Sequence, residues 1–404
     1  MRISIFTDSF LPYISGVTTC VLNQANEFRR RGHAVQIHRP RPPRSADGLP
    51  GLNRGVAVHN LLFSLPVCRF PQLRLALPLL LPTLFRLRRF RPDVIHTHTE
   101  WGCGIESLMA SRLLKTPLVA TLHTFYADPG YLQHLPFSRG SGVHRALWAF
   151  LMAFYNKCNA VITPSHSALD ELTRRGLRPP SFLIENGIGA PRLRDPAFLL
   201  RRRRELGLEG GPHFIYVGRI SQEKSLDVLA RAFARVAPAL PESRLILVGD
   251  GPGKPDLARL FASLGIASRV TDLGMIPHDR LIDENVPLLG DVFVTASKTE
   301  NHPVSLLEAL AFGLPMIGPG ARGIPELIRH EVNGLIFPAD DTEALAAHMQ
   351  LLAIDPALRR RLHEGALSGG ARYLMQRAGD RLEEAYDAVL GRAPAPSAVS
   401  PQAA

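Results

Sequence analysis

Two cations, Arg219 and Lys224, lie five positions apart in a loop that leaves a predicted strand. The apolar run at residues 214–217 is typical of a buried strand, and Gly218 ends it. Arginine offers a rigid fork of donors and lysine a compact charge, so the pair suits a diphosphate group. Two cations at this spacing are also common on protein surfaces. After the next predicted strand, Gly249-Asp250-Gly251-Pro252-Gly253 indicates a tight turn and does not match the GxGxxG pattern of dinucleotide-binding proteins.

Two glutamates, Glu300 and Glu308, flank the start of a predicted helix. Pro303 suits the first helical turn, and free N–H groups near Val304 and Ser305 would face an anion. Because the glutamates are eight positions apart, they cannot stack on one helix face. They can instead reach hydroxyl groups at the two ends of a ligand whose phosphates lie over the helix start. The alternative is a pair of solvated carboxylates.

Short apolar runs alternate with stretches of helical periodicity along the whole chain, which is typical of α/β proteins with parallel sheets. The first series of predicted strands covers residues 3–7, 34–38, 94–98, 118–123, 160–164 and 182–184. The second series covers residues 214–217, 245–248, 270–273, 292–295, 315–318 and 335–337. Since 404 residues exceed one ordinary core, we expect two doubly wound domains. Ligands of such sheets bind at the carboxyl ends of the strands.

The net charge of +11 is unevenly distributed. Residues 1–185 hold 22 Lys and Arg against 10 Asp and Glu, whereas the remaining residues hold 25 against 26. This asymmetry predicts an anionic partner for the N-terminal half. Apolar residues make up 46% of the chain and charged residues 21%, a balance that excludes a disordered or fibrous protein.

The cysteines and the N-terminus both favour a reducing compartment. None of the four cysteines forms a CxxC pair, so we expect free thiols. They are Cys20, Cys68, Cys103 and Cys158. The chain enters its first predicted strand without a secretory signal pattern, and the apolar run at residues 75–85 is too short to span a bilayer. These features predict a cytoplasmic protein, peripheral on the inner face of the cytoplasmic membrane.

His96 and His98 lie two positions apart on one predicted strand and therefore share a face, which is one arrangement of metal ligands. No matching carboxylate or cysteine cluster in the sequence supports a metal. The pattern favours packing at the strand end or lining of an acceptor cleft, and we predict no metal site.

A basic and apolar stretch at residues 67–91 contains six arginines and no acid, with leucines and phenylalanines between them. The arginines are Arg69, Arg74, Arg86, Arg88, Arg89 and Arg91. A stretch of this kind can lie in an anionic membrane interface. Residues 143–154, which include Trp148, are a second candidate. The alternative is that the leucines pack on the sheet and the arginines are only solvated.

Together these motifs resemble the retaining group 1 glycosyltransferases, whose GT-B fold has two Rossmann-like doubly wound domains facing a cleft. The matching segments are Arg219 with Lys224, Gly249-Asp250-Gly251, Glu300 with Glu308, Gly313-Leu314-Pro315, Gly323-Ile324-Pro325-Glu326, Asn333-Gly334 and Asp8 to Val17. The resemblance covers about residues 2–390. The front segment most resembles the diacylglycerol glycosyltransferases and related glycolipid-forming members.

The resemblance implies a role for each donor-site residue. Arg219 and Lys224 would hold the diphosphate of a nucleotide sugar, and Glu308 would bind the ribose hydroxyls. Glu300 would hold sugar hydroxyls, and the amides near Val304 and Ser305 would hold the distal phosphate. The other candidates are Gly16, Val17, Asp250, Gly251, Met275, Ile276, Asn301 and Pro303. Backbone near Met275 and Ile276 would meet the base, and Gly16 would let a helix start approach the phosphate.

Catalysis by this family would require no metal and no cofactor besides the UDP-sugar donor, because the cations stabilise the departing diphosphate. Four residues are the catalytic candidates: His123, Arg219, Lys224 and Glu300. His123 matches a family position beside the reacting sugar. The resemblance implies retention of the anomeric configuration. Pro303 lacks an amide donor, which departs from the pattern of many members.

We therefore expect an N-terminal acceptor- and membrane-binding domain at residues 1–185 and a nucleotide-sugar-binding domain at 186–371. A helix at 372–391 would cross back to the N-terminal domain, and the tail at 392–404 would be disordered. The predicted reaction moves a hexose, glucose or galactose, from a UDP-sugar to a lipid such as diacylglycerol. Alternatives are a GDP-mannose-dependent phosphatidylinositol mannosyltransferase, a polysaccharide glycosyltransferase, a phosphorylase, and a nucleic-acid-binding protein, for which no recognition motif is found.

Overall fold

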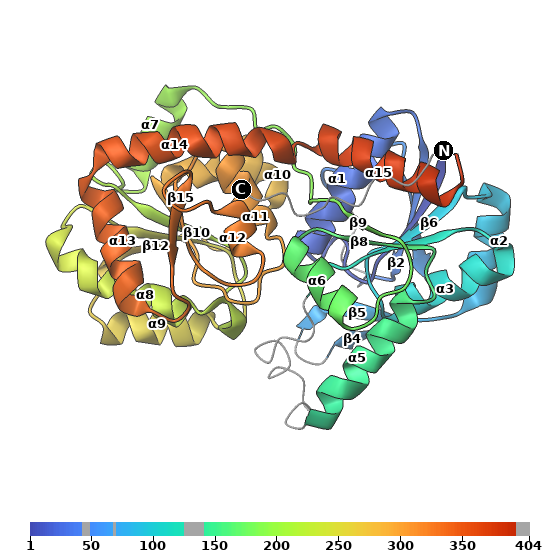
Figure 1. Cartoon of the computed structure of the whole chain (residues 1–404). Helices are drawn as coiled ribbons and strands as arrows, with labels where there is room; N and C mark the ends of the chain where they lie inside the picture. The colour runs from blue at the N-terminus through green and yellow to red at the C-terminus, as the bar shows by residue number, and fades with distance from the viewer. Residues whose placement is uncertain (43–48, 68–69, 125–140, 393–404) are drawn as a thin grey trace. The chain divides into compact units, whose positions relative to one another are not determined.

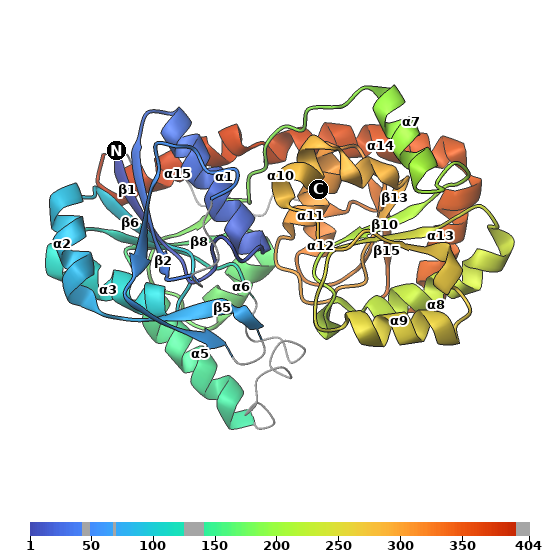
Figure 2. The same ribbon diagram turned by 180° about the vertical axis from the view of Figure 1, so that it is seen from behind.

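The computed structural model describes residues 1–42, 49–67, 70–124 and 141–392 (Figure 1). The chain divides into two compact units. The N-terminal unit holds Met1–Gly189 and the chain from Leu374 onward, and the C-terminal unit holds Ala190–Tyr373. Each unit contains one parallel sheet with helices packed on it (Figures 1 and 2).

The N-terminal unit is built on a seven-stranded parallel sheet with the strand order β3-β2-β1-β6-β7-β8-β9. Its strands are β1 (Arg2–Phe6), β2 (Ala34–Pro40), β3 (Ala57–Leu61), β6 (Val94–Thr97), β7 (Leu118–Thr121), β8 (Ala160–Thr163) and β9 (Ser181–Leu183). Its helices are α1 (Gly16–Arg30), α2 (Leu80–Phe90), α3 (Gly102–Leu114), α5 (Ser141–Tyr155), α6 (His166–Arg174) and α15 (Met375–Val389). A separate antiparallel hairpin joins β4 (Phe63–Val67) to β5 (Phe70–Leu77).

Side-chain alternation along these strands produces two cores, one on each face of the sheet. In β7, Val119 belongs to one core, whereas Leu118 and Ala120 belong to the other. Helices α1 and α15 supply Val21, Ala25, Phe28, Leu382 and Tyr386 to the first core. The hydrophobic faces of the helices therefore hold the sheet from both sides.

The C-terminal helix α15 is part of the N-terminal unit. Arg31, at the end of α1, forms ion pairs of 2.7 Å with both Asp380 and Glu383. The ring of Tyr386 is fully buried and lies 5.7 Å from the ring of Phe28. These contacts fasten the last helix to the first one.

The C-terminal unit has a six-stranded parallel sheet with the order β12-β11-β10-β13-β14-β15. Its strands are β10 (Phe214–Val217), β11 (Leu245–Val248), β12 (Val270–Asp272), β13 (Val292–Val294), β14 (Met316–Pro319) and β15 (Gly334–Phe337). Its helices are α7 (Pro196–Glu205), α8 (Leu226–Val236), α9 (Lys254–Ser263), α10 (His278–Asp283), α11 (Val304–Ala311), α12 (Ile324–Leu327), α13 (Thr342–Ile354) and α14 (Pro356–Gly370).

The predicted strands all overlap observed strands, and α11 begins at Val304, one residue after the Pro303 that was predicted to lie in its first turn. Helix α7 buries none of its residues. Three strands, β3, β4 and β5, and the helix α14 were not predicted. The stretch at residues 67–91 is not one amphipathic element, because it is divided between strand β5 and helix α2. Among its residues, Arg69 lies outside the described part of the chain, as does the tail beyond Arg392.

Candidate active site

The order of strands in the C-terminal unit places a ligand site beside β10. The chain runs from β10 outward to β11 and β12, and then returns to begin β13 on the other side of β10. In a doubly wound sheet, a crevice opens at the carboxyl ends of the two strands where the order reverses. The loop after β10 carries Arg219 and Lys224, and the loop after β13 carries Glu300. The predicted donor residues therefore meet at this switch point.

Both cations are held by carboxylates in these loops. The ammonium group of Lys224 donates to Glu300 across the switch point, and the side chains of both residues are about one-fifth exposed. Arg219 donates to the Oε1 atom of Glu223 at 2.6 Å, and the hydroxyl of Ser221 donates to the same oxygen at 2.6 Å. Burial opposes the charge of Glu223, but Arg219 and Ser221 outweigh it and lower the pKa of this carboxyl. Glu223 was not among the predicted site residues.

The glycines of the predicted turn after β11 allow two loops to touch. A Cβ on Gly249 would lie 1.9 Å from the carbonyl oxygen of Gly218, and the φ of Gly249 is 142°. The N–H of Ile220 donates to the carbonyl of Asp250 at 2.9 Å. Close backbone approach, for which only glycine has room, therefore explains this motif. The contact between these two loops supports the loop that carries Arg219.

Glu308 lies inside α11 and is bound to a histidine that the sequence did not single out. Glu308 is 6% exposed, and its Oε1 atom lies 2.6 Å from the Nε2 atom of His278 at the start of α10. Burial alone would lower the pKa of His278, but the hydrogen bond and the charge of Glu308 raise it. The available signal was the position of His278 two residues after Ile276, the end of the predicted base-contacting segment. That segment contains Met275, which is 55% exposed, and the half-buried Ile276.

Helix α11 begins directly after Pro303, close to where the sequence predicted an anion-binding helix start. Pro303 occupies the N-cap with an extended backbone, so the first helical N–H groups belong to Val304 and Ser305. Such groups have no acceptor within the helix. Asn301, before the proline, is buried. The missing amide of Pro303 lies outside the helix and removes none of these helical donors.

The Gly323 segment supports the loop that holds Glu300. The N–H of Gly323 donates to the carbonyl of Glu300 at 3.1 Å, and a Cβ on Gly323 would lie 1.6 Å from the carbonyl oxygen of Asn301. Asn333 acts further away: its side-chain amide donates to Leu327 at 2.9 Å. Gly323 therefore holds the loop of Glu300 in place.

Replacing Gly323 by alanine is expected to lower the free energy of unfolding by about 1–3 kcal/mol, because the loop must move to admit the methyl group. Chemical denaturation measures this loss. Gly369→Ala is the matched control, since the nearest atom to its added Cβ is 3.8 Å away. Equal stability of the two variants would show that Gly323 does not brace the loop.

In the N-terminal unit the strand order reverses between β1 and β6, and Asp8 lies at this point. Its buried carboxylate accepts the hydroxyl of Thr99 at 2.8 Å and the N–H groups of Ala76 and Cys103 at 3.1–3.2 Å. Burial raises the pKa of Asp8, and these hydrogen bonds oppose the shift. Asp8 therefore ties three segments together. The helix α1 begins nearby at Gly16 and Val17, with Ser15 accepting the N–H of Thr18 at 3.1 Å.

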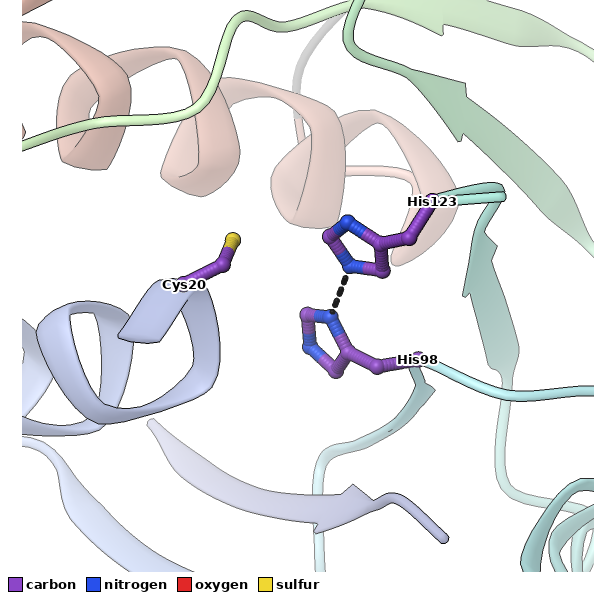
Figure 3. Close-up of side chains that lie close together, drawn as sticks. All are labelled: Cys20, His98 and His123. Carbon is purple, nitrogen blue, oxygen red and sulfur yellow. Dashed lines mark hydrogen bonds between the residues drawn. The ribbon is translucent and has the colours of Figure 1, made fainter. Parts of the chain in front are cut away.

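His123 follows β7 in the chain, and its ring is stacked against the ring of His98. Its Nε2 atom lies 2.8 Å from Nδ1 of His98 (Figure 3). The ring of His96 packs against that of His98, with 4.1 Å between the ring centroids, but its nitrogens bind Tyr386 and Thr121, each at 2.7 Å. Burial lowers the pKa of His96 to about 3. Both ring nitrogens of His96 are therefore bonded to other side chains of the N-terminal unit.

The arginines of the basic stretch differ in their surroundings. Arg74 braces the hairpin through two hydrogen bonds to Ser64 at 2.9 and 2.7 Å, and Arg86 donates to the carbonyl of Asn60 at 3.3 Å. Three arginines at the end of α2 are exposed to solvent: Arg88, Arg89 and Arg91. The placement of Trp148 on a membrane-facing surface is wrong. It is 6% exposed, and the guanidinium of Arg175 lies 3.8 Å from its ring centre.

Large apolar side chains are exposed close to these arginines. They gather on the β4–β5 hairpin, the turn after it and helix α2. They are Leu62, Phe63, Leu65, Leu75, Leu77, Leu79, Leu81 and Phe85, and the most exposed are Leu81 at 81% and Phe85 at 72%. We call this set the hairpin–helix surface. Within the described ranges, no helix combines the length and the apolarity needed to cross a membrane.

Comparisons with known proteins agree with the geometry. The model of Glycosyltransferase Family 4 matches residues 14–190, and the model of Glycosyl transferases group 1 matches residues 201–368. The alpha-monoglucosyldiacylglycerol synthase of Streptococcus pneumoniae is 28% identical over 399 residues, which cover 96% of this chain and 86% of that protein. A GDP-mannose-dependent alpha-mannosyltransferase of Mycolicibacterium smegmatis is 30% identical over 401 residues, or 97% and 98% of the two chains. The crystal structure of Anabaena HepE with UDP-glucose has a TM-score of 0.76 at 20% identity and covers 96% of this chain and 100% of its own.

Proposed function

The chain belongs to the group 1 glycosyltransferase family, with the GT-B fold, and we propose that it transfers a hexose from a nucleotide sugar to a membrane lipid. The observation that carries this proposal is the meeting of Arg219, Lys224 and Glu300 at the switch point of the C-terminal sheet. Two cations and a helix start are suited to a diphosphate, and two carboxylates are suited to hydroxyl groups.

The proposed chemistry begins with departure of the nucleoside diphosphate from the anomeric carbon. Arg219 and Lys224 stabilise the negative charge that develops on the leaving phosphate, together with the N–H groups at the start of α11. The acceptor oxygen forms the new glycosidic bond on the same face of the sugar. Its proton passes to the leaving phosphate oxygen, so the reaction needs no separate protein base. Glu308, positioned by His278, binds the ribose hydroxyls.

For the donor we propose a UDP-hexose, either UDP-glucose or UDP-galactose. The similarity to the two alpha-monoglucosyldiacylglycerol synthases, over more than 90% of this chain, supports a hexose and a diacylglycerol acceptor. GDP-mannose is the second candidate donor, because relatives named GDP-mannose-dependent alpha-mannosyltransferases reach 30–31% identity.

For the acceptor side we propose that the hairpin–helix surface rests on an anionic membrane, which would make the protein peripheral on the inner face of the cytoplasmic membrane. Leu81 and Phe85 would enter the interface, while Arg88, Arg89 and Arg91 would meet lipid phosphates. Each cation near an anionic surface contributes about 1 kcal/mol to binding. The apolar side chains add a contribution to the binding free energy that does not depend on salt. This distinguishes membrane binding from binding to a polyanion such as nucleic acid.

Replacing both Leu81 and Phe85 by glutamate is expected to weaken partitioning into vesicles of anionic phospholipid by at least about tenfold, because burial of one such side chain is worth about 1.5–3 kcal/mol. Cosedimentation with vesicles measures the change. The matched control is Leu200→Glu, at a position 63% exposed on α7 of the other unit. Identical partitioning of all three proteins would exclude the hairpin–helix surface as the membrane contact.

The reaction itself is tested by incubating the protein with UDP- or GDP-sugars and vesicles that contain diacylglycerol or phosphatidylinositol, followed by mass spectrometry of the lipids. We expect the mass of diacylglycerol to increase by one hexose with a UDP-sugar. A phosphatidylinositol product made with GDP-mannose would select the second candidate. Product formed only on soluble acceptors would contradict a lipid acceptor.

A further inference from the structure

Cys20, His98 and His123, which we call the thiol–imidazole cluster, come from three elements that are distant in sequence. Cys20 lies on α1, His98 follows β6 and His123 follows β7 (Figure 3). The donor chemistry above assigns no role to Cys20 or His98. We infer that the thiol–imidazole cluster binds a soft divalent cation such as Zn²⁺, with one ligand atom from each residue.

The geometry of the cluster already approximates a metal site. One donor atom from each residue lies within 4.8 Å of the others. In a tetrahedral zinc site, neighbouring ligand atoms are roughly 3.3–3.7 Å apart, as bond lengths of about 2.0–2.3 Å require. The facing nitrogens of His98 and His123 are closer than this, at 2.8 Å, because they share a proton. A cation in the place of that proton would spread the rings slightly and draw in the Cys20 side chain, which points toward them (Figure 3).

The chemical types of the three ligand atoms indicate which metal ions the cluster can bind. One sulfur and two imidazole nitrogens suit Zn²⁺ and Co²⁺, whereas Mg²⁺ and Ca²⁺ require oxygen ligands. Three protein ligands also leave a fourth position open, because His123 is only partly buried. The sequence argued against a metal because it showed no cysteine near the histidines. The fold supplies that cysteine from α1.

Cys20 is a buried free thiol, and a bound cation must release its proton and hold the thiolate. The sulfur now accepts a hydrogen bond from Gln24 at 3.4 Å and donates one to Asn186 at 3.3 Å. The contact from Gln24 can persist on a thiolate and would stabilise its charge.

Zinc binding by the chelator-treated full-length protein tests the inference, with equilibrium dialysis as the measurement. We expect the wild-type chain to bind one more Zn²⁺ than Cys20→Ser or His98→Gln, or to bind it at least about tenfold more tightly. Co²⁺ provides a second readout, because a thiolate-to-cobalt absorption band should appear in the wild type and be lost in Cys20→Ser. Cys158→Ser is the matched control, since this buried thiol of the same unit only donates to the carbonyl of Phe154 at 3.5 Å.

Any of three results would overturn the inference. Cys20→Ser could bind zinc as tightly as the wild type, the wild type could bind no zinc, or Cys158→Ser could lose as much zinc affinity as Cys20→Ser. A functional consequence rests on the proposed function: Zn²⁺ should inhibit sugar transfer by the wild type more than by Cys20→Ser, because it occupies His123. Dialysis requires no activity, so failure of the proposed function and failure of the metal site give separate results.

Discussion

Arg219→Ala is expected to lower the turnover of sugar transfer by about 10²–10³-fold, the usual effect of removing a group that stabilises charge in the transition state. The guanidinium of Arg219 is one-third exposed and is oriented by Glu223, whose carboxylate is itself fixed by Ser221. This arrangement prepares a donor fork at the switch point before any ligand arrives. Because the diphosphate gains charge as the bond breaks, the effect should fall on kcat as well as on the donor KM.

The matched control for Arg219 is Arg235→Ala. Arg235 lies on α8 of the same unit and forms a 2.6 Å ion pair with Glu343 on the surface. Its loss should leave turnover unchanged, because exposed ion pairs contribute little. Turnover near the wild-type value in Arg219→Ala would remove this residue from the donor site.

The second large effect is expected for Lys224→Ala, which should reduce kcat/KM by about 10²-fold or more. Activity falls for two reasons. The diphosphate loses a cation that would bind it, and the carboxylate of Glu300 is left near the diphosphate without the ammonium group of Lys224. Glu300→Gln should also reduce activity, because it weakens the hydrogen bonds to the sugar. The double variant should lose less than the two single losses predict, with a coupling energy of about 0.5–3 kcal/mol.

Kinetics of the four proteins in this cycle measure the coupling. Lys298 provides the control, since its 2.7 Å ion pair with Asp340 is more exposed and lies in the same unit. Lys298→Ala should leave kcat/KM unchanged. Strict additivity of Lys224→Ala and Glu300→Gln would show that the pair does not act as a unit.

The fold could be predicted because the apolar pattern of each segment agrees with the place of that segment in the folded domain. Buried parallel strands are continuous apolar runs, and each helix carries one apolar face, as in the stripe of Leu226, Leu229, Phe233 and Val236 on α8. The meeting of Lys224 with Glu300 followed from the same pattern, because loops after neighbouring strands must meet at one edge of the sheet. The start of α11 was also visible in the sequence, since proline marks a helix entry.

Other features depend on packing between distant segments, which periodicity does not encode. The sequence did not show that Trp148 turns inward under Arg175, or that Arg74 binds Ser64 across a hairpin. The hydrogen bond of His278 to Glu308 and the approach of Cys20 to two histidines depend on segments that only the fold brings together. The glycines at positions 249 and 323 look like turn residues, yet the backbone carbonyls of other loops are what exclude a side chain there.

Binding of nucleoside diphosphates tests the proposed donor site most directly. Isothermal titration calorimetry of UDP and GDP, each against the wild type, Arg219→Ala and Arg235→Ala, requires neither a sugar nor an acceptor. We expect UDP to bind the wild type and Arg235→Ala with a stoichiometry of one, and Arg219→Ala at least about tenfold more weakly, as the loss of a charged hydrogen bond predicts. Failure of the wild type to bind either nucleotide, or equal binding by Arg219→Ala, would contradict a diphosphate site at the switch point of the C-terminal sheet.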